Sequence, residues 1–200
     1  MNDKLKERIQ ELVKEEISIV PYDPMWKEMF REESKYLRDL LPEEQVRRIE
    51  HFGSTAVPNL SAKPIIDILV EVKSLEEVKR YIVPILKGVG YEYFWRPTIG
   101  NRPPYYAWFI KRNPRGERTH HIHMVEKNSE LWDRLLFRDY LREFSDEVKR
   151  YDELKRKLSE VYPNDRVKYT EGKTEYVVSV TEKAKEHFSK VHIGFFKNNK

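Results

Sequence analysis

The spacing of apolar residues changes about two-thirds of the way along the chain. Up to that point, amphipathic helical segments alternate with short runs of β-branched and aromatic residues, which are typical of strands. From Ser129 onward the apolar positions recur at helical spacing. This order predicts an α+β fold with a helical C-terminal part. Strands are expected at 17–20, 46–52, 65–70, 91–95, 105–112 and 117–125, and helices at 4–16, 24–41, 74–88, 131–140, 145–161 and 174–189.

Several helix ends carry recognisable signals. Ser74 and Glu77 are spaced as a capping box, and Ser145 or Asp146 can cap the helix that follows them. Pro84 is expected to kink its helix, because it lacks the N–H group that an α-helix requires.

Composition narrows the class of protein. Two hundred residues, 39% of them hydrophobic, suit a single domain, 1–200, in which residues 1–16 form a helical extension. With 38 basic and 34 acidic residues, the net charge of +4 is compatible with a nucleotide or nucleic-acid partner but does not require one. The lack of cysteine excludes disulfides, thiolate catalysis and cysteine-type zinc sites. No apolar run approaches the roughly 20 residues of a membrane span, so we expect a cytoplasmic protein without a membrane partner.

The turn Gly53-Ser54-Thr55 directly follows a predicted strand. A glycine there lets the backbone approach a ligand closely, and the N–H groups of a helix start attract anions. Backbone amides and two hydroxyls could therefore hold a phosphate. The alternative is an ordinary helix start with Ser54 or Thr55 as its N-cap. The turn is not a P-loop, because no Gly-Lys-Ser/Thr follows at the required spacing.

Asp67 interrupts the apolar run 65–70. Burying a carboxylate there is costly unless it is paired, hydrogen-bonded or bound to a metal. We therefore consider Asp67 either a catalytic or metal-binding residue, or half of a structural ion pair with Lys63 or an arginine. Glu71 shares its strand face, but at about 13 Å along the strand it is too far away to share one metal ion with Asp67.

His121 and His123 fall on the same face of a predicted strand, about 7 Å apart. Together with a carboxylate from a neighbouring strand they could bind a metal ion. The alternative is a polar strand face lining a cleft, or a pair of hydrogen-bonded core histidines. His120 points to the other face, and His51 is expected to support the glycine turn through a hydrogen bond.

Arg138 and Arg142 are four residues apart and share one helical face. They could clamp a polyphosphate, since guanidinium groups bind phosphate oxygens in pairs. The alternative is a solvated face with salt bridges to Asp139 and Glu143.

Taken together, these residues resemble the GrpB-like family, which has a nucleotidyltransferase-type fold of the polymerase-β superfamily. The resemblance covers roughly residues 17–190. It rests on His-Phe-Gly-Ser-Thr-Ala-Val-Pro-x-Leu-x-Ala-Lys-Pro-Ile-Ile-Asp-Ile at 51–68, His-x-His at 121–123 and Phe-Arg-Asp-Tyr-Leu-Arg at 137–142, with supporting positions at Tyr22, Trp26, Tyr151, Lys155, Tyr169 and Lys173.

The resemblance implies a mixed β-sheet core, with the Gly53-Ser54 turn at the triphosphate position and Lys63 near the phosphates. It places Asp67 on the strand that carries metal ligands. This chain departs from the superfamily pattern, because Leu69 stands where a second acid is usual. One aspartate and two histidines suit a single ion, and imidazole suits zinc or manganese better than magnesium. Asn59 replaces a usual glycine, and asparagine tolerates the left-handed backbone expected there.

Three hypotheses follow. The first is an enzyme or degenerate enzyme that binds a nucleoside triphosphate with one divalent ion. If active, it would transfer a nucleotidyl or phosphoryl group, with Asp67 as its catalytic residue. The second is a non-catalytic module for a nucleotide, a coenzyme-A-related molecule or RNA, bound largely by the aromatic and basic segment 95–118. The third, a structural partner-binding domain, is disfavoured because scaffolding requires no acid inside an apolar strand. In the first hypothesis the metal is magnesium, manganese or zinc, held by Asp67, His121 and His123, and the phosphates contact Gly53, Ser54, Thr55, Lys63, Arg138 and Arg142.

Overall fold

The structure, a computed structural model, describes residues 3–96 and 104–197, which belong to two compact units. The first unit, residues 23–58 and 64–134, contains the β-sheet. The second is mainly helical and contains the segments up to residue 22, 59–63 and from 135 onward. The single domain expected from chain length stays a prediction.

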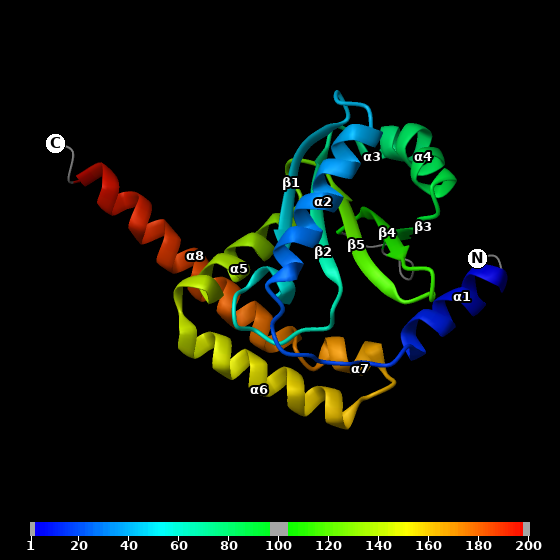
Figure 1. Cartoon of the computed structure of the whole chain (residues 1–200). Coiled ribbons are helices and arrows are strands. Elements are labelled where there is room, and N and C mark those ends of the chain that lie inside the picture. The colour runs from blue at the N-terminus through cyan, green and yellow to red at the C-terminus, as the bar shows by residue number, and fades with distance from the viewer. Residues whose placement is uncertain (1–2, 97–103, 198–200) are drawn as a thin grey trace. The chain divides into compact units, whose positions relative to one another are not determined.

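The sheet has five strands in the order β1-β2-β5-β4-β3 (Figure 1). Strands β2 and β5 are parallel, whereas β1–β2, β5–β4 and β4–β3 are antiparallel. This mixed sheet, with a helical C-terminal part, confirms the predicted α+β class. The strands are β1 (Val46–Phe52), β2 (Ile66–Val72), β3 (Glu92–Arg96), β4 (Tyr106–Arg112) and β5 (Arg118–Val125).

The core of the sheet unit forms around β2, which lies between β1 and β5. Ile66, Ile68, Leu69 and Val70 are fully buried, as expected for a strand with neighbours on both sides. Helix α2 (Met25–Leu40) packs against β1 and β2 (Figure 1) and buries an apolar stripe that includes Trp26. Burial of such a stripe supplies most of the stability of an amphipathic helix.

The helical segment after β2 is less regular than its spacing suggests. It consists of α3 (Leu75–Glu77), a π-helical turn η2 (Val78–Ile82) and α4 (Val83–Gly88). The kink predicted at Pro84 appears as this π-helical turn just before it, because proline cannot donate the backbone hydrogen bond of a continuous α-helix. Ser74 is the N-cap and accepts a hydrogen bond from the N–H of Glu76, whereas Glu77 pairs with Lys73.

The remaining helices are α1 (Asp3–Lys14), α5 (Asp133–Glu143), α6 (Ser145–Val161), α7 (Arg166–Glu171) and α8 (Thr174–Lys197), with short 3-10 turns η1 (Ser54–Ala56) and η3 (Glu130–Trp132). Within the helical unit, Tyr169 on α7 is 1% exposed and Lys155 on α6 is equally buried.

Two predictions about local structure are wrong, and one helix was not predicted. The strand at 17–20 is a single bridge between Val20 and Ala62, because Pro21 lacks the N–H that would extend a ladder. The N-cap of α6 is Phe144, and Ser145 is already helical. Helix α7 was not predicted, although Asp165 caps it by accepting a hydrogen bond from the N–H of Lys168.

Candidate functional site

The sheet register brings Asp67, His121 and His123 together. Asp67 on β2 pairs directly with His121 on the parallel strand β5, and His123 lies two residues further along the same strand face. Oδ1 of Asp67 is 3.2 Å from Nδ1 of His121 and 4.0 Å from Nε2 of His123. One potential ligand atom from each residue lies within 4.8 Å of the other two. The predicted same-face pair of histidines and its carboxylate from a neighbouring strand therefore exist in the fold.

The three residues differ in exposure. The side chains of His121 and His123 are 11% and 12% exposed, whereas that of Asp67 is 29% exposed. Asp67 is thus less buried than its apolar sequence neighbours suggest, because it is the second residue of β2 and lies near the strand end. A partly exposed carboxylate beside two largely buried histidines can be reached by a ligand from solvent.

Aromatic rings surround the histidines. Tyr106 stacks on His123 with ring centroids 5.3 Å apart, while Phe52 and Trp108 meet His123 and His121 edge-on, each at 5.1 Å. Burial lowers the pKa of His123 to about 3, and the positive charges of Arg134 and Arg96 add to the effect while Asp67 opposes it. His123 is therefore neutral near pH 7, which is the form that coordinates metals. Among the described residues, its Nδ1 is buried without a hydrogen-bond partner.

The glycine turn lies against the acid. Gly53 has φ +73° and ψ −172°, and a Cβ at this position would lie 2.5 Å from Oδ2 of Asp67. Only glycine accommodates both this backbone conformation and this contact. Gly53 and Asp67, 14 positions apart in the long sequence motif, therefore meet in space.

His51 and Thr55 support the turn from within. Nε2 of His51 lies 3.0 Å from the Thr55 hydroxyl, which donates to the carbonyl oxygen of Ile65 at 3.4 Å. Phe30 of α2 stacks on the His51 ring at 4.8 Å. This confirms the support predicted for His51. Because Thr55 is buried and its hydroxyl is engaged in these contacts, the phosphate role expected for it stays a prediction.

The other expected phosphate contacts belong to the helical unit, and each has a partner there. Arg138 donates two hydrogen bonds to Asp139, at 2.7 and 2.9 Å, and Arg142 donates one at 3.2 Å. Nζ of Lys63 lies 5.4 Å from the ring centroid of Tyr169. The salt bridges foreseen as the alternative for the arginines are present with Asp139, although Arg138 is buried rather than solvated. The phosphate roles of these three residues stay predictions.

Two arginines near the histidines were not singled out by sequence reasoning, although Arg96 lies within the segment 95–118 that was expected to bind a ligand. Arg96 ends β3 and lies over the ring of Trp108, and Arg134 lies over the ring of Phe52. Strand pairing of Arg96 with Tyr106 explains its position, but the sequence offered only a loop boundary there. Residues 97–103 of the segment expected to bind ligand lie outside the described residues.

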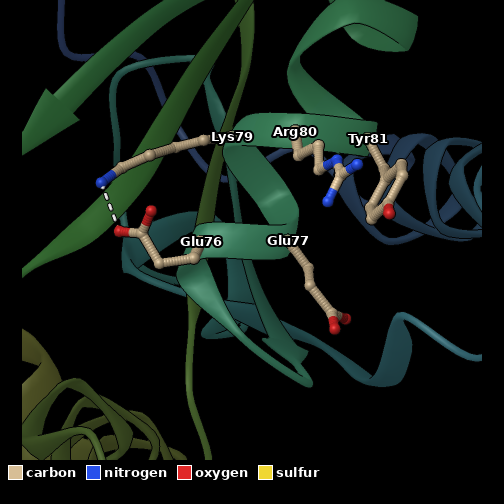
Figure 2. Close-up of a pocket in the computed structure, with 5 residues that line it drawn as sticks. All are labelled: Glu76, Glu77, Lys79, Arg80 and Tyr81. Atoms are coloured by element: carbon tan, nitrogen blue, oxygen red, sulfur yellow. Dashed lines mark hydrogen bonds and ion pairs between the residues drawn. The ribbon is translucent and has the colours of Figure 1, made fainter.

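Two hollows contain none of these residues. His120 faces the other side of β5, where it lines a small cavity with Glu33 and Lys111. A second, open hollow lies on α3 and η2, with Glu76, Glu77, Lys79, Arg80 and Tyr81 around it (Figure 2). Lys79 forms a salt bridge there with Glu76 at 2.7 Å, and such pairs are common on exposed helix surfaces. Neither hollow is lined by two histidines and a carboxylate, the set found around Asp67.

Two imidazoles and one carboxylate form a donor set suited to zinc or manganese, and three protein ligands leave coordination positions open for another molecule. Magnesium prefers oxygen ligands and fits this set less well. The geometry is therefore that of a candidate metal centre with room for a ligand. No helix among the described residues is long and apolar enough to cross a membrane.

Known proteins resemble this chain over most of its length. A family model described as "GrpB protein" matches residues 16–183. The glutamate-rich protein GrpB of Alkalihalophilus pseudofirmus is 38% identical over 165 residues, which make up 82% of this chain and 93% of that protein. The crystal structure of GrpB from Enterococcus faecalis matches this chain with 34% identity and a TM-score of 0.75. The match covers 86% of this chain and 99% of the Enterococcus chain. A cytoplasmic RNA terminal U-transferase has a weakly similar fold, with 16% identity and a TM-score of 0.44. The match covers 78% of this chain and 44% of that chain. So distant a likeness says nothing about activity.

Proposed function

The chain belongs to the GrpB family, and we propose that it binds one divalent metal ion through Asp67, His121 and His123 and uses that ion to hold a phosphate-containing small molecule such as a nucleotide. The observation that supports the proposal most strongly is the approach of three ligand atoms, from two parallel strands, to within 4.8 Å of one another. A bound ion would act as a Lewis acid toward a phosphoryl oxygen.

Each residue of the site would have a separate role in binding. Asp67 supplies the negative charge that attracts the ion, and His123, neutral near pH 7, binds it without first releasing a proton. The Gly53-Ser54 turn, which touches Asp67 through Gly53, is the proposed place for the phosphate. Thr55 and His51 hold this turn in position.

Binding is proposed in preference to nucleotidyl transfer. Two-metal transfer chemistry requires several carboxylates, whereas Leu69, at the position of the usual second acid, is fully buried and paired in register with His123. A transfer assay with labelled nucleotides and a panel of small acceptors tests this distinction. Turnover that depends on Asp67 would make the protein an enzyme.

Calorimetric titration with zinc and manganese tests the metal centre. We expect one ion per chain, and at least tenfold weaker binding in Asp67→Asn, His121→Gln and His123→Gln. His120→Gln is the matched control, because His120 lies on the same strand but faces the opposite side. Loss of binding in His120→Gln, or unchanged binding in Asp67→Asn, would show that the ion binds elsewhere.

A further inference from the structure

Two guanidinium groups lie against aromatic rings that contact the candidate metal ligands. Cζ of Arg96 is 5.8 Å from the ring centroid of Trp108, and Cζ of Arg134 is 5.8 Å from that of Phe52. These are cation–π distances, so each guanidinium rests on an aromatic ring. Arg96 comes from the end of β3 and Arg134 from the first turn of α5.

The same rings contact the histidines. Trp108 meets His121 edge-on and Phe52 meets His123 edge-on, so one aromatic ring contacts both an arginine and a candidate ligand in each case. In the sheet order, Phe52 lies on β1 and Trp108 on β4, and the strands of the three candidate ligands lie between them. The two rings therefore lie on opposite sides of the metal group, and each has an arginine against it.

The charge balance favours an anion between them. One carboxylate offsets only half the charge of a divalent ion, so the occupied site would be positive before the arginines are counted. Each guanidinium contacts a ring that itself contacts a candidate ligand, so two further positive charges lie beside the site. If the two arginines served only to pack against aromatic rings, there would be no reason for both to lie beside a cation site.

We propose that Arg96 and Arg134 bind the phosphate group of the ligand held at the metal centre. This inference rests on the proposed function and names the residues that give it specificity for phosphate. Guanidinium presents a planar fork of N–H donors that matches two phosphate oxygens, and the supporting rings restrict the motion of both side chains. Neither residue is part of the motif on which the family resemblance rests.

The experiment compares four proteins: wild type, an Arg96→Gln/Arg134→Gln double variant, an Arg96→Lys/Arg134→Lys double variant, and Arg48→Gln. Arg48 is the matched control, because its guanidinium also lies over a ring, that of Trp132 at 5.1 Å, but already pairs with Glu50. Manganese affinity is measured first. Inorganic phosphate and adenosine monophosphate are then titrated into each manganese-loaded protein, and a stronger signal for the nucleotide identifies a contribution from the base.

We expect phosphate binding to weaken at least tenfold in the glutamine double variant, less in the lysine variant, and not at all in Arg48→Gln. Manganese affinity should stay the same or increase, because two nearby positive charges are removed; this also shows that the site still folds. Phosphate affinity within twofold of wild type in the glutamine variant, with manganese bound normally, overturns the arginine assignment alone. Failure of wild type to bind manganese or zinc overturns the proposed function, and the inference with it.

Discussion

Gly53 and Asp67 are in contact, so closely that a Cβ at position 53 would lie 2.5 Å from a carboxylate oxygen of Asp67. The glycine that begins the turn and the acid that follows it are therefore parts of one structure. The absence of a side chain at position 53 lets Asp67 keep its place beside His121, 3.2 Å away.

Replacing Gly53 by alanine should destabilise the protein and disturb the metal centre. The backbone at Gly53 lies in a region that only glycine adopts readily, and the new methyl group would displace the Asp67 carboxylate. We expect a loss of about 2–4 kcal/mol in the free energy of unfolding, measured by urea denaturation, from backbone strain and steric overlap together. Zinc affinity should fall at least tenfold.

Gly116→Ala is the control for this substitution. Gly116 also has a positive φ of +82°, but a Cβ there would meet no atom within 4 Å. It should cost about 1–2 kcal/mol from the left-handed backbone alone and leave zinc affinity unchanged. Equal effects of the two variants on zinc binding would contradict the role given to the Gly53–Asp67 contact.

Thr55→Val tests whether this threonine supports the turn or binds phosphate. Loss of the hydroxyl breaks the contacts with His51 and the Ile65 carbonyl, and should cost about 1–2 kcal/mol in thermal or urea unfolding. Metal affinity should stay within about threefold of wild type. Unchanged stability combined with weaker phosphate binding would instead make Thr55 a phosphate ligand.

Lys155 makes stability depend on pH. Burial lowers the pKa of this lysine from 10.5 to about 7; the nearby positive charges of Lys173 and Arg156 also disfavour protonation, while Asp152 opposes them. Between these two pH values the unfolded chain binds the proton more readily than the folded protein does. The free energy of unfolding should therefore rise as pH increases from 7 toward 9, by at most about 1.4 kcal/mol per pH unit, and the full cost of protonation is present below pH 7.

The measurement is urea unfolding at several pH values for wild type and Lys155→Met. The methionine variant should lose the upward slope, whatever its stability at pH 7. Lys168→Met is the control, because Lys168 is 63% exposed and pairs weakly with Asp165 at 3.7 Å. A slope that persists in Lys155→Met would assign the pH dependence to other groups.

The local elements followed from the sequence to a large extent. Apolar runs identified all five strands, and strand alternation placed His121 and His123 on one face. Errors arose where a short-range signal competed with tertiary contacts. The segment ending at Val20 was expected to be a strand but forms a bridge only with Ala62, and α7 was not among the expected helices.

The site itself could be anticipated only in part. Its residue types were visible, but the pairing of Asp67 with His121 depends on two strands that are not neighbours in the chain. The positions of Arg96 and Arg134 depend on rings contributed by other strands. Periodicity within one segment contains no information about such contacts between segments, so the nearness of these two residues to the histidines became apparent only in the structure.

The central claim is that Asp67, His121 and His123 hold one metal ion. Crystals grown with manganese or zinc, measured at the absorption edge of the metal, test it directly. The account predicts an anomalous peak about 2.0–2.3 Å from a carboxylate oxygen of Asp67, Nδ1 of His121 and Nε2 of His123. A peak that contacts none of the three, or full metal occupancy at the same place in Asp67→Asn crystals, would contradict it.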